Sequence, residues 1–502
     1  MKKLKISGLV ALILSAVLLS SFAYADEDDG DQPSKSAMDF AYKTYFHFHP
    51  PQDRTLKHNL YPYANDPIKT GADIPVCPAA KSLETYARKR DLKVIEHGKD
   101  GWLFRTVDFR TDFSPSPQSL EYFKRLNKTL ADHGQTLVVA FQPPRAYASA
   151  KFIDPNDTPK DYTPEKALKG YEAFLKQLND AGIKTVDLSD LSKFPANTTY
   201  FSKGDFHWAP AGSSDAAEKV AAVLKDMPAY SALPKQDFVS EEVGIDVASR
   251  GAYEEFIQQT CQENIELTTK PVWATHAAGT GAADPSGLLG DVAFPAVTVI
   301  GTSNSAEDDK FNFVGALKHF AHTDIYNAAL TAGGFSSSAY RYYASDEYHE
   351  HPPKIVVWEF LPQHNFNNTE SVNGFRQMIP AVYGACSKDK ALAAYDGDIT
   401  KEQTTFFDKI EKISLDNTYL YLDVKDPKER NLSVEVLYKN GDADQVDLTR
   451  STRIANNGKY YYELGNPGDT NALFFHLITD QPKGHMTARL CPYPTKTTVA
   501  EK

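Results

Sequence analysis

The sequence predicts an α/β protein in which a parallel β-sheet covered by helices is followed by an all-β sandwich. Two observations predict this fold class. From about residue 119 to residue 360, short apolar runs alternate with stretches of helical periodicity, which is the pattern of repeated β–α units. After Cys386, short strand-like runs separated by turn residues replace that alternation, as in a sandwich. In a parallel sheet, we expect the active site at the carboxyl ends of the strands.

The helices and strands of the first half follow from periodicity and from stop signals. Residues 119–133 carry leucine and phenylalanine at helical spacing before Gly134. A second helix begins after the Thr163-Pro164 pair, a favourable cap, and ends near Ala181. Two further helices are expected at residues 211–225 and 312–320. Apolar runs predict strands at residues 136–141, 183–188, 296–300, 324–329 and 354–360.

The second half contains short strands and turns. The expected strands lie at residues 419–424, 432–438, 445–448, 460–464 and 472–479, and Asn/Gly-rich or Pro/Gly-rich turns separate several of them. We expect residues 387–410 to form a linker with some helix. The predicted organisation is therefore a catalytic domain over residues 26–385, followed by the linker and sandwich over residues 386–502.

The first 25 residues have the features of a secretory signal peptide. Three lysines stand within the first five positions, an apolar run covers residues 9–19, and Ala23-Tyr24-Ala25 is a small-residue cleavage site. No later run reaches the ~18 consecutive apolar residues that a membrane span needs. We expect residues 1–25 to be removed and the mature chain to reach the periplasm without itself spanning the membrane.

The composition excludes some partners. The chain of 502 residues has a formal net charge of −12, and losing the three N-terminal lysines makes it more acidic. Nucleic acid is not an expected partner, because binding it requires clustered lysine and arginine. A polyanionic glycan would also need a local basic groove that the total charge conceals.

The four cysteines suggest disulfide bonds, because an even number in an exported protein is typical of a disulfide framework. Three pairings are possible, and the spacing favours Cys77 with Cys261 and Cys386 with Cys491, one bond in each half. No C-x-x-C spacing occurs, so we expect neither a zinc knuckle nor a redox pair.

Two short segments contain candidate catalytic residues. Ser303, in Gly301-Thr302-Ser303, follows a predicted buried strand and precedes a helix, which suits a nucleophile and part of an oxyanion hole. Asp205 and His207 stand two residues apart before another helix, so their side chains can enter one cleft. His207 is the candidate base, and Asp205 the candidate acid that orients it.

Together, these segments resemble the AlgX and AlgJ group of alginate O-acetyltransferases, which are SGNH-hydrolase-like proteins. The resemblance rests on the blocks GDFHW at residues 204–208 and GTSNS at residues 301–305. It extends to DGWLFR at residues 100–105, NFVGAL at residues 312–317, PPKIVVWEF at residues 352–360 and the placement of the cysteines. It covers nearly the whole mature chain, including the β-rich tail.

The resemblance implies an SGNH-hydrolase-like domain with the triad Asp205, His207 and Ser303. It also implies a circular permutation, because the serine block comes last here and first in ordinary SGNH hydrolases. It further implies transfer of acetyl groups to an exopolysaccharide, with alginate mannuronate as the leading acceptor and a cellulose-like or other glycan as the alternative. The acetyl donor would be relayed by a membrane-bound acyltransferase, and the other partners would be proteins of the periplasmic alginate export and polymerisation complex. A polysaccharide acetylesterase and a non-catalytic glycan-binding scaffold are the alternatives.

The remaining candidates concern substrate binding and metals. The backbone N–H of Ser303 is one expected oxyanion donor, and Asn304, Arg145 and Arg341 are candidates for the second donor or for substrate binding. The tail resembles a carbohydrate-binding module, with Arg450, Arg453, Lys459 and Tyr460 as candidate glycan ligands. No cofactor is expected. The pairs His47/His49 and His349/His351 come with no third ligand at recognisable spacing, so no metal site is expected.

Overall fold

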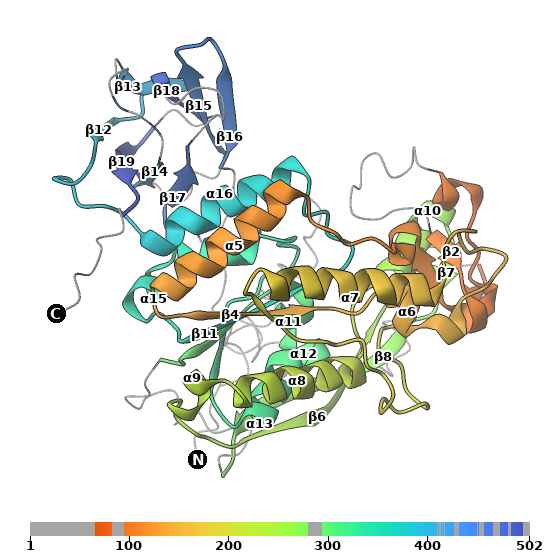
Figure 1. The fold of residues 1–502 in the computed structure, drawn as a ribbon. Helices are drawn as coiled ribbons and strands as arrows, with labels where there is room; N and C mark the ends of the chain where they lie inside the picture. Colours follow the sequence, from red (N-terminus) through yellow and green to blue (C-terminus); the bar gives the residue numbers. More distant parts are fainter. Residues whose placement is uncertain are drawn as a thin grey trace, which may run out of the picture.

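The computed structural model describes residues 66–82, 95–279, 294–408, 417–425, 431–448, 456–464, 472–479 and 483–494, together with residues 410, 413, 415 and 450 (Figure 1). The predicted signal peptide lies outside these residues. Among the described residues, no helix combines the length and the apolar character that crossing a membrane requires.

A five-stranded sheet forms the centre of the first half, in the order β10-β9-β11-β4-β5, and all its neighbouring strands run parallel. Its strands are β4 (Thr136–Phe141), β5 (Lys184–Thr185), β9 (Val297–Ile300), β10 (Ile325–Asn327) and β11 (Ile355–Phe360). Every residue of β9 and β11 is buried, as expected of strands covered on both faces. The sheet confirms the predicted parallel α/β arrangement, although β5 pairs over only two of its six expected residues.

Helices cover both faces of this sheet (Figure 1). On one face, α5 (Pro117–Asp132), α7 (Pro164–Asp180), α14 (Ser337–Tyr343) and α16 (Thr369–Tyr383) contribute to one hydrophobic core. On the other, α8 (Pro210–Lys225) and α13 (Phe313–Ala321) contribute to a second. The side chain of Ser116 accepts from Ser119 N, and that of Thr163 accepts from Lys166 N, so a hydroxyl caps α5 and α7.

Smaller elements surround the sheet, and several have no counterpart in the sequence prediction. Strands β6 (Phe238–Ser249) and β8 (Thr268–Ala277) form an antiparallel ribbon, with α10 (Ala252–Cys261) between them in the chain. The other short pieces are β1 (Ile68–Lys69), β2 (Ile95–His97), β3 (Leu103–Arg105), α6 (Arg145–Ala148), α9 (Pro228–Ser231), β7 (Asn264–Ile265), α11 (Ser303–Ala306), α12 (Asp308–Phe311) and α15 (Asp346–Glu350).

The tail consists of two four-stranded antiparallel sheets, in the orders β12-β19-β14-β17 and β13-β18-β15-β16. The strands are β12 (Ala393–Asp398), β13 (Gln403–Asp408), β14 (Thr418–Val424), β15 (Leu432–Tyr438), β16 (Ala443–Asp447), β17 (Lys459–Glu463), β18 (Ala472–Thr479) and β19 (His485–Pro492). The prediction of a linker with some helix at residues 387–410 was wrong, because β12 and β13 lie there. Both are edge strands with few buried residues, so they lack the apolar alternation that marks a strand.

The tail shares a hydrophobic core with the first half. The buried side chains of Tyr419, Tyr421, Tyr461 and Tyr493 belong to the same core as those of α5 and α16. Glu463 accepts from both terminal nitrogens of Arg125, at 2.7 and 2.5 Å. Figure 1 shows β17 beside α16. Because Tyr461 belongs to this shared core and Tyr460 and Tyr462 to the core of the tail, β17 is covered on both of its faces.

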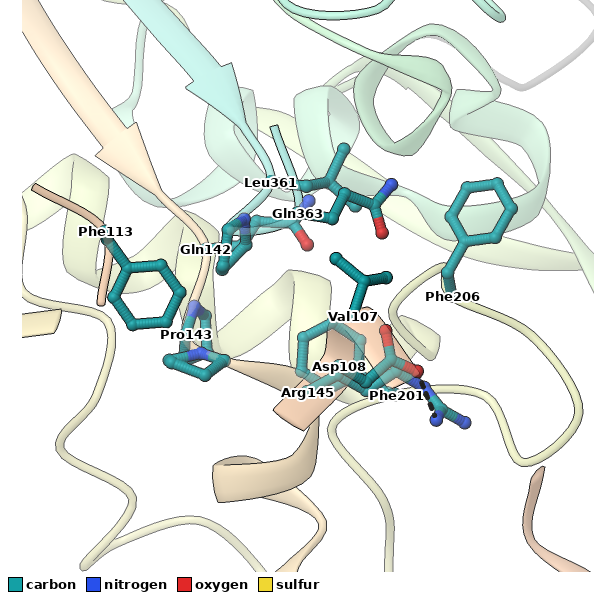
Figure 2. Close-up of a pocket in the computed structure, with 12 residues that line it drawn as sticks. Val107, Asp108, Phe113, Gln142, Pro143, Arg145, Phe201, Phe206, Leu361 and Gln363 are labelled. Atoms are coloured by element: carbon teal, nitrogen blue, oxygen red, sulfur yellow. Dashed lines mark hydrogen bonds and ion pairs between the residues drawn. The ribbon is translucent and has the colours of Figure 1, made fainter. Parts of the chain in front are cut away.

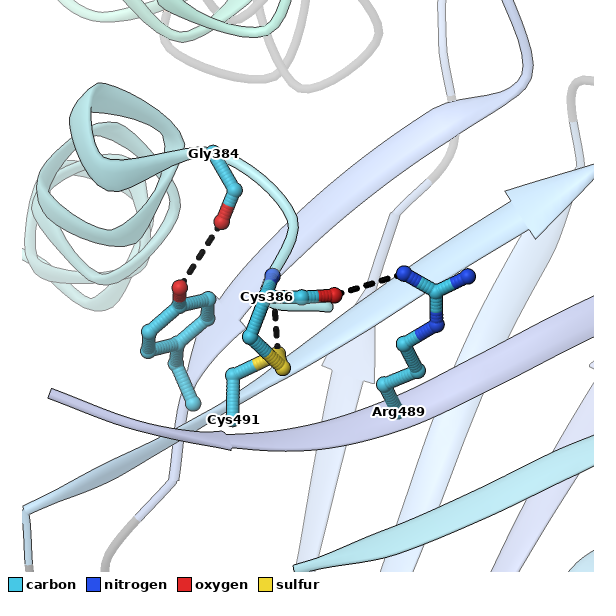
Figure 3. Close-up of a disulfide and its surroundings, with 5 residues drawn as sticks. Gly384, Cys386, Arg489 and Cys491 are labelled. Carbon is cyan, nitrogen blue, oxygen red and sulfur yellow. Dashed lines mark hydrogen bonds between the residues drawn. A yellow bond between two sulfur atoms is a disulfide. The ribbon is translucent and has the colours of Figure 1, made fainter. Parts of the chain in front are cut away.

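Two disulfides join distant parts of the chain, in the pairing that the spacing favours. Cys77 is bonded to Cys261 and Cys386 to Cys491. Figure 3 shows the second bond where the chain leaves α16 and enters the tail, with Arg489 donating to the carbonyl of Cys386 at 2.6 Å. This disulfide fastens the end of the first half to the last strand of the tail.

Candidate active site

The nucleophile candidate, Ser303, lies at the carboxyl end of β9. Strand β9 ends at Ile300, and α11 begins at Ser303 itself. Thr302 caps the turn, since its hydroxyl accepts from Asn304 N at 3.3 Å. Gly301 is needed here, because a Cβ at this position would come within 2.6 Å of Glu359. The sequence therefore folds into the strand–turn–helix junction that the prediction required.

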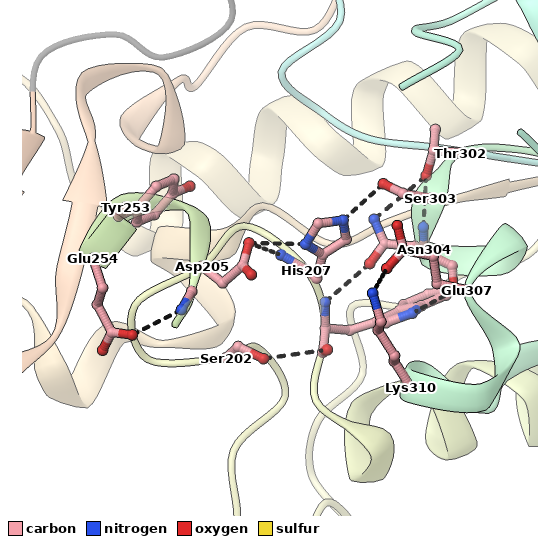
Figure 4. A network of polar contacts seen from close by, with 12 residues as sticks. Ser202, Asp205, His207, Tyr253, Glu254, Thr302, Ser303, Asn304, Glu307 and Lys310 are labelled. Carbon is pink, nitrogen blue, oxygen red and sulfur yellow. Dashed lines mark hydrogen bonds and ion pairs between the residues drawn. The ribbon is translucent and has the colours of Figure 1, made fainter. Parts of the chain in front are cut away.

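Asp205, His207 and Ser303 are joined by consecutive hydrogen bonds (Figure 4). The loop before α8 closes on itself through a bridge between Phe201 and Trp208. Within it, His207 Nδ1 lies 2.8 Å from Asp205 Oδ1, and His207 Nε2 lies 2.7 Å from Ser303 Oγ. A carboxylate can only accept, so Nδ1 donates to Asp205 and Nε2 is left to accept from the serine hydroxyl.

Asp205 is buried, and its pKa lies below the ordinary value for aspartate. Burial on its own would raise this pKa, but the charge and hydrogen bonds of His207, with Lys270 nearby, outweigh it. Asp205 is therefore ionised at neutral pH. An ionised carboxylate in this position stabilises an imidazolium on His207.

Aromatic rings and a buried asparagine hold the imidazole in place. The ring of His207 stacks on Phe311 with centroids 4.7 Å apart, and its centroid lies 4.2 Å from that of Phe206. Asn304 accepts from Trp208 N through its side chain at 3.0 Å and from Trp208 Nε1 through its carbonyl at 3.1 Å. These contacts tie the histidine loop directly to the serine turn.

Asn304 was a candidate for the second oxyanion donor, and its side chain is partly engaged within the chain. Its oxygen accepts from Trp208 N, and its Nδ2 lies 3.4 Å from Thr302 Oγ1. The backbone N–H of Ser303, in contrast, has no acceptor among the described residues. The serine turn thus offers one N–H group that a developing negative charge could use.

Glu359, at the end of β11, anchors the serine turn from behind. Its buried carboxylate accepts from Thr302 N at 2.8 Å, from the hydroxyls of Thr302 and Ser305 at 2.9 and 3.0 Å, and from Gln142 Nε2 at 2.7 Å. Burial raises its pKa, and the hydrogen bonds oppose that shift. The sequence alone left Glu359 without a role, because its donors lie on two other segments.

Arg145, a candidate for substrate binding, supports the histidine loop instead. Its guanidinium is only 5% exposed and donates to the carbonyls of Leu103 and Ser202, both at 2.8 Å, and of Lys203 at 3.1 Å. It also pairs with the buried Asp108 at 3.3 Å, in the wall of a small pocket (Figure 2). Because these contacts occupy the terminal nitrogens, Arg145 orders the chain before Asp205 and leaves no terminal N–H directed at a ligand.

The candidate glycan ligands of the tail do not form an accessible surface. Arg450 is 4% exposed, donates to the carbonyl of Lys459 and stacks on Tyr460, which is 1% exposed. Lys459 forms an ion pair with Asp346 of the first half. Arg341, on α14, is partly buried, and Arg453 lies outside the described residues. The predicted sugar-binding role does not fit Arg450, Lys459 and Tyr460, because other residues of the chain already engage the polar groups of these three side chains.

No cluster of three or more histidine, cysteine or carboxylate side chains suited to a metal ion occurs among the described residues. His351 stacks on Phe294, and burial lowers the pKa of His349. The pair His47/His49 lies outside the described part of the chain.

Comparisons with known proteins identify the family of this chain. Residues 95–362 match the family described as the SGNH hydrolase-like domain of the acetyltransferase AlgX. The alginate biosynthesis protein AlgX of Pseudomonas aeruginosa is 32% identical over 416 residues, which cover 81% of this chain and 85% of that protein. The probable alginate O-acetylase AlgJ of the same bacterium is 27% identical over 315 residues, or 60% of this chain and 78% of that protein.

A solved structure is also similar over most of the chain. The structure of Pseudomonas aeruginosa AlgX matches with a TM-score of 0.73 at 28% identity, covering 83% of this chain and 99% of that one. The similarity therefore extends beyond the part matched by the family into the β-rich tail.

Proposed function

Since this chain belongs to the AlgX family of SGNH hydrolase-like acetyltransferases, we propose that it is a polysaccharide O-acetyltransferase with a Ser-His-Asp triad. The observation that carries the proposal is the unbroken hydrogen-bonded series from Asp205 through His207 to Ser303, with distances of 2.8 and 2.7 Å. Such a series activates a hydroxyl for nucleophilic attack.

The reaction has two steps that use the same base. In the first, His207 takes the proton of Ser303 as Oγ attacks the acetyl carbonyl of the donor. The bond to the leaving group breaks, His207 returns the proton to that group, and an acetyl ester remains on Ser303. In the second, a sugar hydroxyl attacks the acetyl group and gives its proton to His207, which passes it back to Ser303 Oγ.

The Ser303 N–H is the proposed first donor to the oxyanion. This assignment is supported by the hydrogen bonds around it, because Glu359 accepts the Thr302 N–H and Thr302 accepts the Asn304 N–H. A donor aimed at the developing charge and engaged nowhere else is the kind that lowers the barrier.

The proposed acceptor is the mannuronate of alginate. The names of the relatives, an alginate biosynthesis protein and a probable alginate O-acetylase, support this choice. We propose that cleavage after residue 25 releases the protein into the periplasm. There, a membrane-bound acyltransferase system would supply the acetyl group and the proteins of the alginate export and polymerisation complex would be its neighbours.

The proposed organisation is a circularly permuted catalytic domain over residues 26–385 and a carbohydrate-binding module within residues 386–502. The order of the triad along the chain, Asp205 and His207 before Ser303, supports the permutation. The sheet β13-β18-β15-β16, in which alternate residues of β15 and β18 are partly exposed, is the surface that such a module would present, rather than the buried residues Arg450 and Tyr460.

An acetylesterase would use the same triad, with water in place of the sugar hydroxyl. A glycan-binding scaffold would need no triad at all, so the 2.7 Å contact between His207 and Ser303 speaks against a purely structural role. Only the fate of the acetyl group separates the transferase from the esterase.

The test is an assay on the purified mature protein with a chromogenic acetyl ester, with and without unacetylated mannuronate oligomers. We expect the oligomers to gain acetyl mass, and we expect Ser303→Ala to lower that gain by at least about 10³-fold, as the loss of a triad nucleophile does. The melting temperature should stay within a few degrees of the wild type.

Two results would contradict the proposal. Full activity in Ser303→Ala would remove the serine from the reaction. Cleavage of the chromogenic ester without any gain in oligomer mass would be consistent with the triad. It would identify the protein as an esterase, or as a transferase with another acceptor.

A further inference from the structure

A second cleft lies beside the segment that leads into the histidine loop. It is bounded by Tyr147 to Phe152 on one side and by residues 191–200 on the other, with Trp102 in its floor. Its cavity volume is about 210 Å³, below the ~300–1,000 Å³ that is typical of ligand pockets, so it suits one small ring rather than a larger ligand. None of the triad residues lines it.

Aromatic rings form the walls of this cleft. Trp102 stacks on Phe152 with centroids 4.4 Å apart and planes at 12°, and Tyr200 packs against Phe194 with centroids 5.3 Å apart. Trp102 and Tyr200 are buried, whereas Phe152 and Phe194 are partly exposed at the mouth. The cleft thus combines a closed floor with an open, aromatic rim.

Two of the residues that line this cleft carry a buried hydroxyl. Ser149 Oγ and Tyr200 Oη have no hydrogen-bond partner among the described residues, and their side chains are 2% and 1% exposed. Buried hydroxyls are almost always hydrogen-bonded, because burial without a partner is unfavourable. Burial also raises the pKa of Tyr200 far above its ordinary value, so this phenol keeps the proton that it can donate.

A positive charge stands at the rim. Lys151 is exposed, its Nζ lies 4.9 Å from the centre of the Phe152 ring, and it donates to the carbonyl of Ala196 at 3.0 Å. An ammonium group has three donors, so two remain for a ligand. The chemistry that fits is a ring with apolar C–H faces, several hydroxyls and a carboxylate, which describes a hexuronate.

We propose that this cleft is an accessory binding site for a uronate residue of the acceptor polysaccharide. Phe152 and Phe194 contact the apolar C–H groups of the sugar ring, Ser149 and Tyr200 bond to its hydroxyls, and Lys151 pairs with its carboxylate. The choice of a uronate rests on the proposed function, whereas the presence of a site for a polyhydroxylated ring rests on the cleft alone.

The position of Tyr200 connects this cleft to the triad. Its carbonyl accepts from Ala209 N at 2.9 Å, and the next residue, Phe201, pairs with Trp208. Tyr200 therefore stands where the histidine loop begins and ends. A polysaccharide held in the cleft contacts the base of the loop that carries Asp205 and His207.

The decisive variant is Tyr200→Phe, which removes one unpartnered hydroxyl and nothing else. Tyr343→Phe is the matched control, since Tyr343 Oη is also buried and unpartnered among the described residues but lies in the core beneath α14 and does not line the cleft. Removing such a hydroxyl leaves the melting temperature unchanged or raises it. Ser149→Ala repeats the test at the second hydroxyl.

Binding is measured with unacetylated mannuronate oligomers, without an acetyl donor, by calorimetry and by hydrogen exchange read by mass spectrometry. We expect a saturating oligomer to protect peptides covering residues 147–152 and 194–200. We expect Tyr200→Phe to weaken binding at this site roughly five- to tenfold, the value of one hydrogen bond, and Tyr343→Phe to leave it as in the wild type. Lys151→Ala should weaken binding of uronate oligomers but not of neutral mannose oligomers.

The outcomes separate this inference from the proposed function. If saturating oligomers leave those peptides unprotected, or if Tyr200→Phe and Tyr343→Phe bind equally, the cleft is not a glycan site, whatever the acetylation assay gives. Protection by neutral oligomers alone would overturn the assignment of a uronate. Hydrolysis of a chromogenic acetyl ester, recorded for each variant, reports damage to the triad separately.

Discussion

At the scale of single residues, Asp205 carries the clearest electrostatic consequence. Its pKa is held below the ordinary value in the folded chain, so it binds protons less readily there than in the unfolded chain. The stability that it contributes is fully present above the unfolded-state pKa of ~3.9 and is lost as the pH falls through the lower, folded value. Asp205 is therefore charged throughout the neutral pH range.

We expect Asp205→Asn to lower the turnover of a chromogenic ester at pH 7 by as much as ~10⁴-fold, because the imidazole loses the acceptor that fixes its tautomer. We also expect the difference in unfolding free energy between wild type and variant to be largest near neutral pH and to shrink below about pH 4. Urea unfolding at several pH values measures it. A difference that grows on acidification would contradict the depressed pKa.

The sequence alone was enough to select Asp205, His207 and Ser303 as candidates, because they lie in the short segments GDFHW (204–208) and GTSNS (301–305), whose residues together resemble one family. It did not indicate what holds them. Glu359 and Arg145 act through partners more than fifty residues away in the chain, and nothing in the local pattern links such residues. A buried glutamate at the end of an apolar strand was the one available clue, since a carboxylate there requires several donors.

At the scale of elements, the strongly apolar strands were predictable and the polar ones were not. Strands β4, β9 and β11 are short, uninterrupted apolar runs, whereas the edge strands β12 and β13 expose much of their length. Strand β17 carried a signal that the prediction misread. Three successive tyrosines, at positions 460–462, indicate a strand buried on both faces rather than one that presents aromatic rings to a ligand.

The disulfide between Cys386 and Cys491 gives a prediction at this scale. It closes a sequence separation of 105 residues, and a loop of about that length is worth up to ~4.7 kcal/mol in the chain-entropy description. We expect the double change Cys386→Ser and Cys491→Ser to lower the free energy of unfolding by about 2–5 kcal/mol, measured by denaturant unfolding. Adding reductant to the double variant should have no further effect on the tail, and an unchanged stability would contradict the prediction.

At the scale of the whole molecule, the two halves share one of their cores. Tyrosines from β14 and β17 pack with α5 and α16, Glu463 pairs with Arg125, and Asp444 pairs with Arg376. The two halves differ in sequence pattern, with alternating helices and strands before Cys386 and short strands with turns after it, and this difference suggested separable domains. The contacts between them could not be predicted, because they depend on which faces of the tail remain uncovered after each half has folded.

A chain that ends at residue 385 tests this arrangement. We expect the shortened chain to lose cooperative unfolding and to associate. Without the tail, the apolar surface of α5 and α16 that packs against the tyrosines of β14 and β17 is exposed to solvent. Circular dichroism on heating and size-exclusion chromatography measure the two effects. A shortened chain with the melting temperature of the wild type would show that the first half folds without the tail.

The packing of β14 and β17 against the first half also has a consequence for how such proteins diversify. A tail borrowed from another protein would arrive without the tyrosines that fit against α16 and without a carboxylate for Arg125. Recombination at residue 386 would therefore create mismatched surfaces at this contact. Substitutions on the other sheet, β13-β18-β15-β16, would disturb this fit less, except at Asp444, which pairs with Arg376.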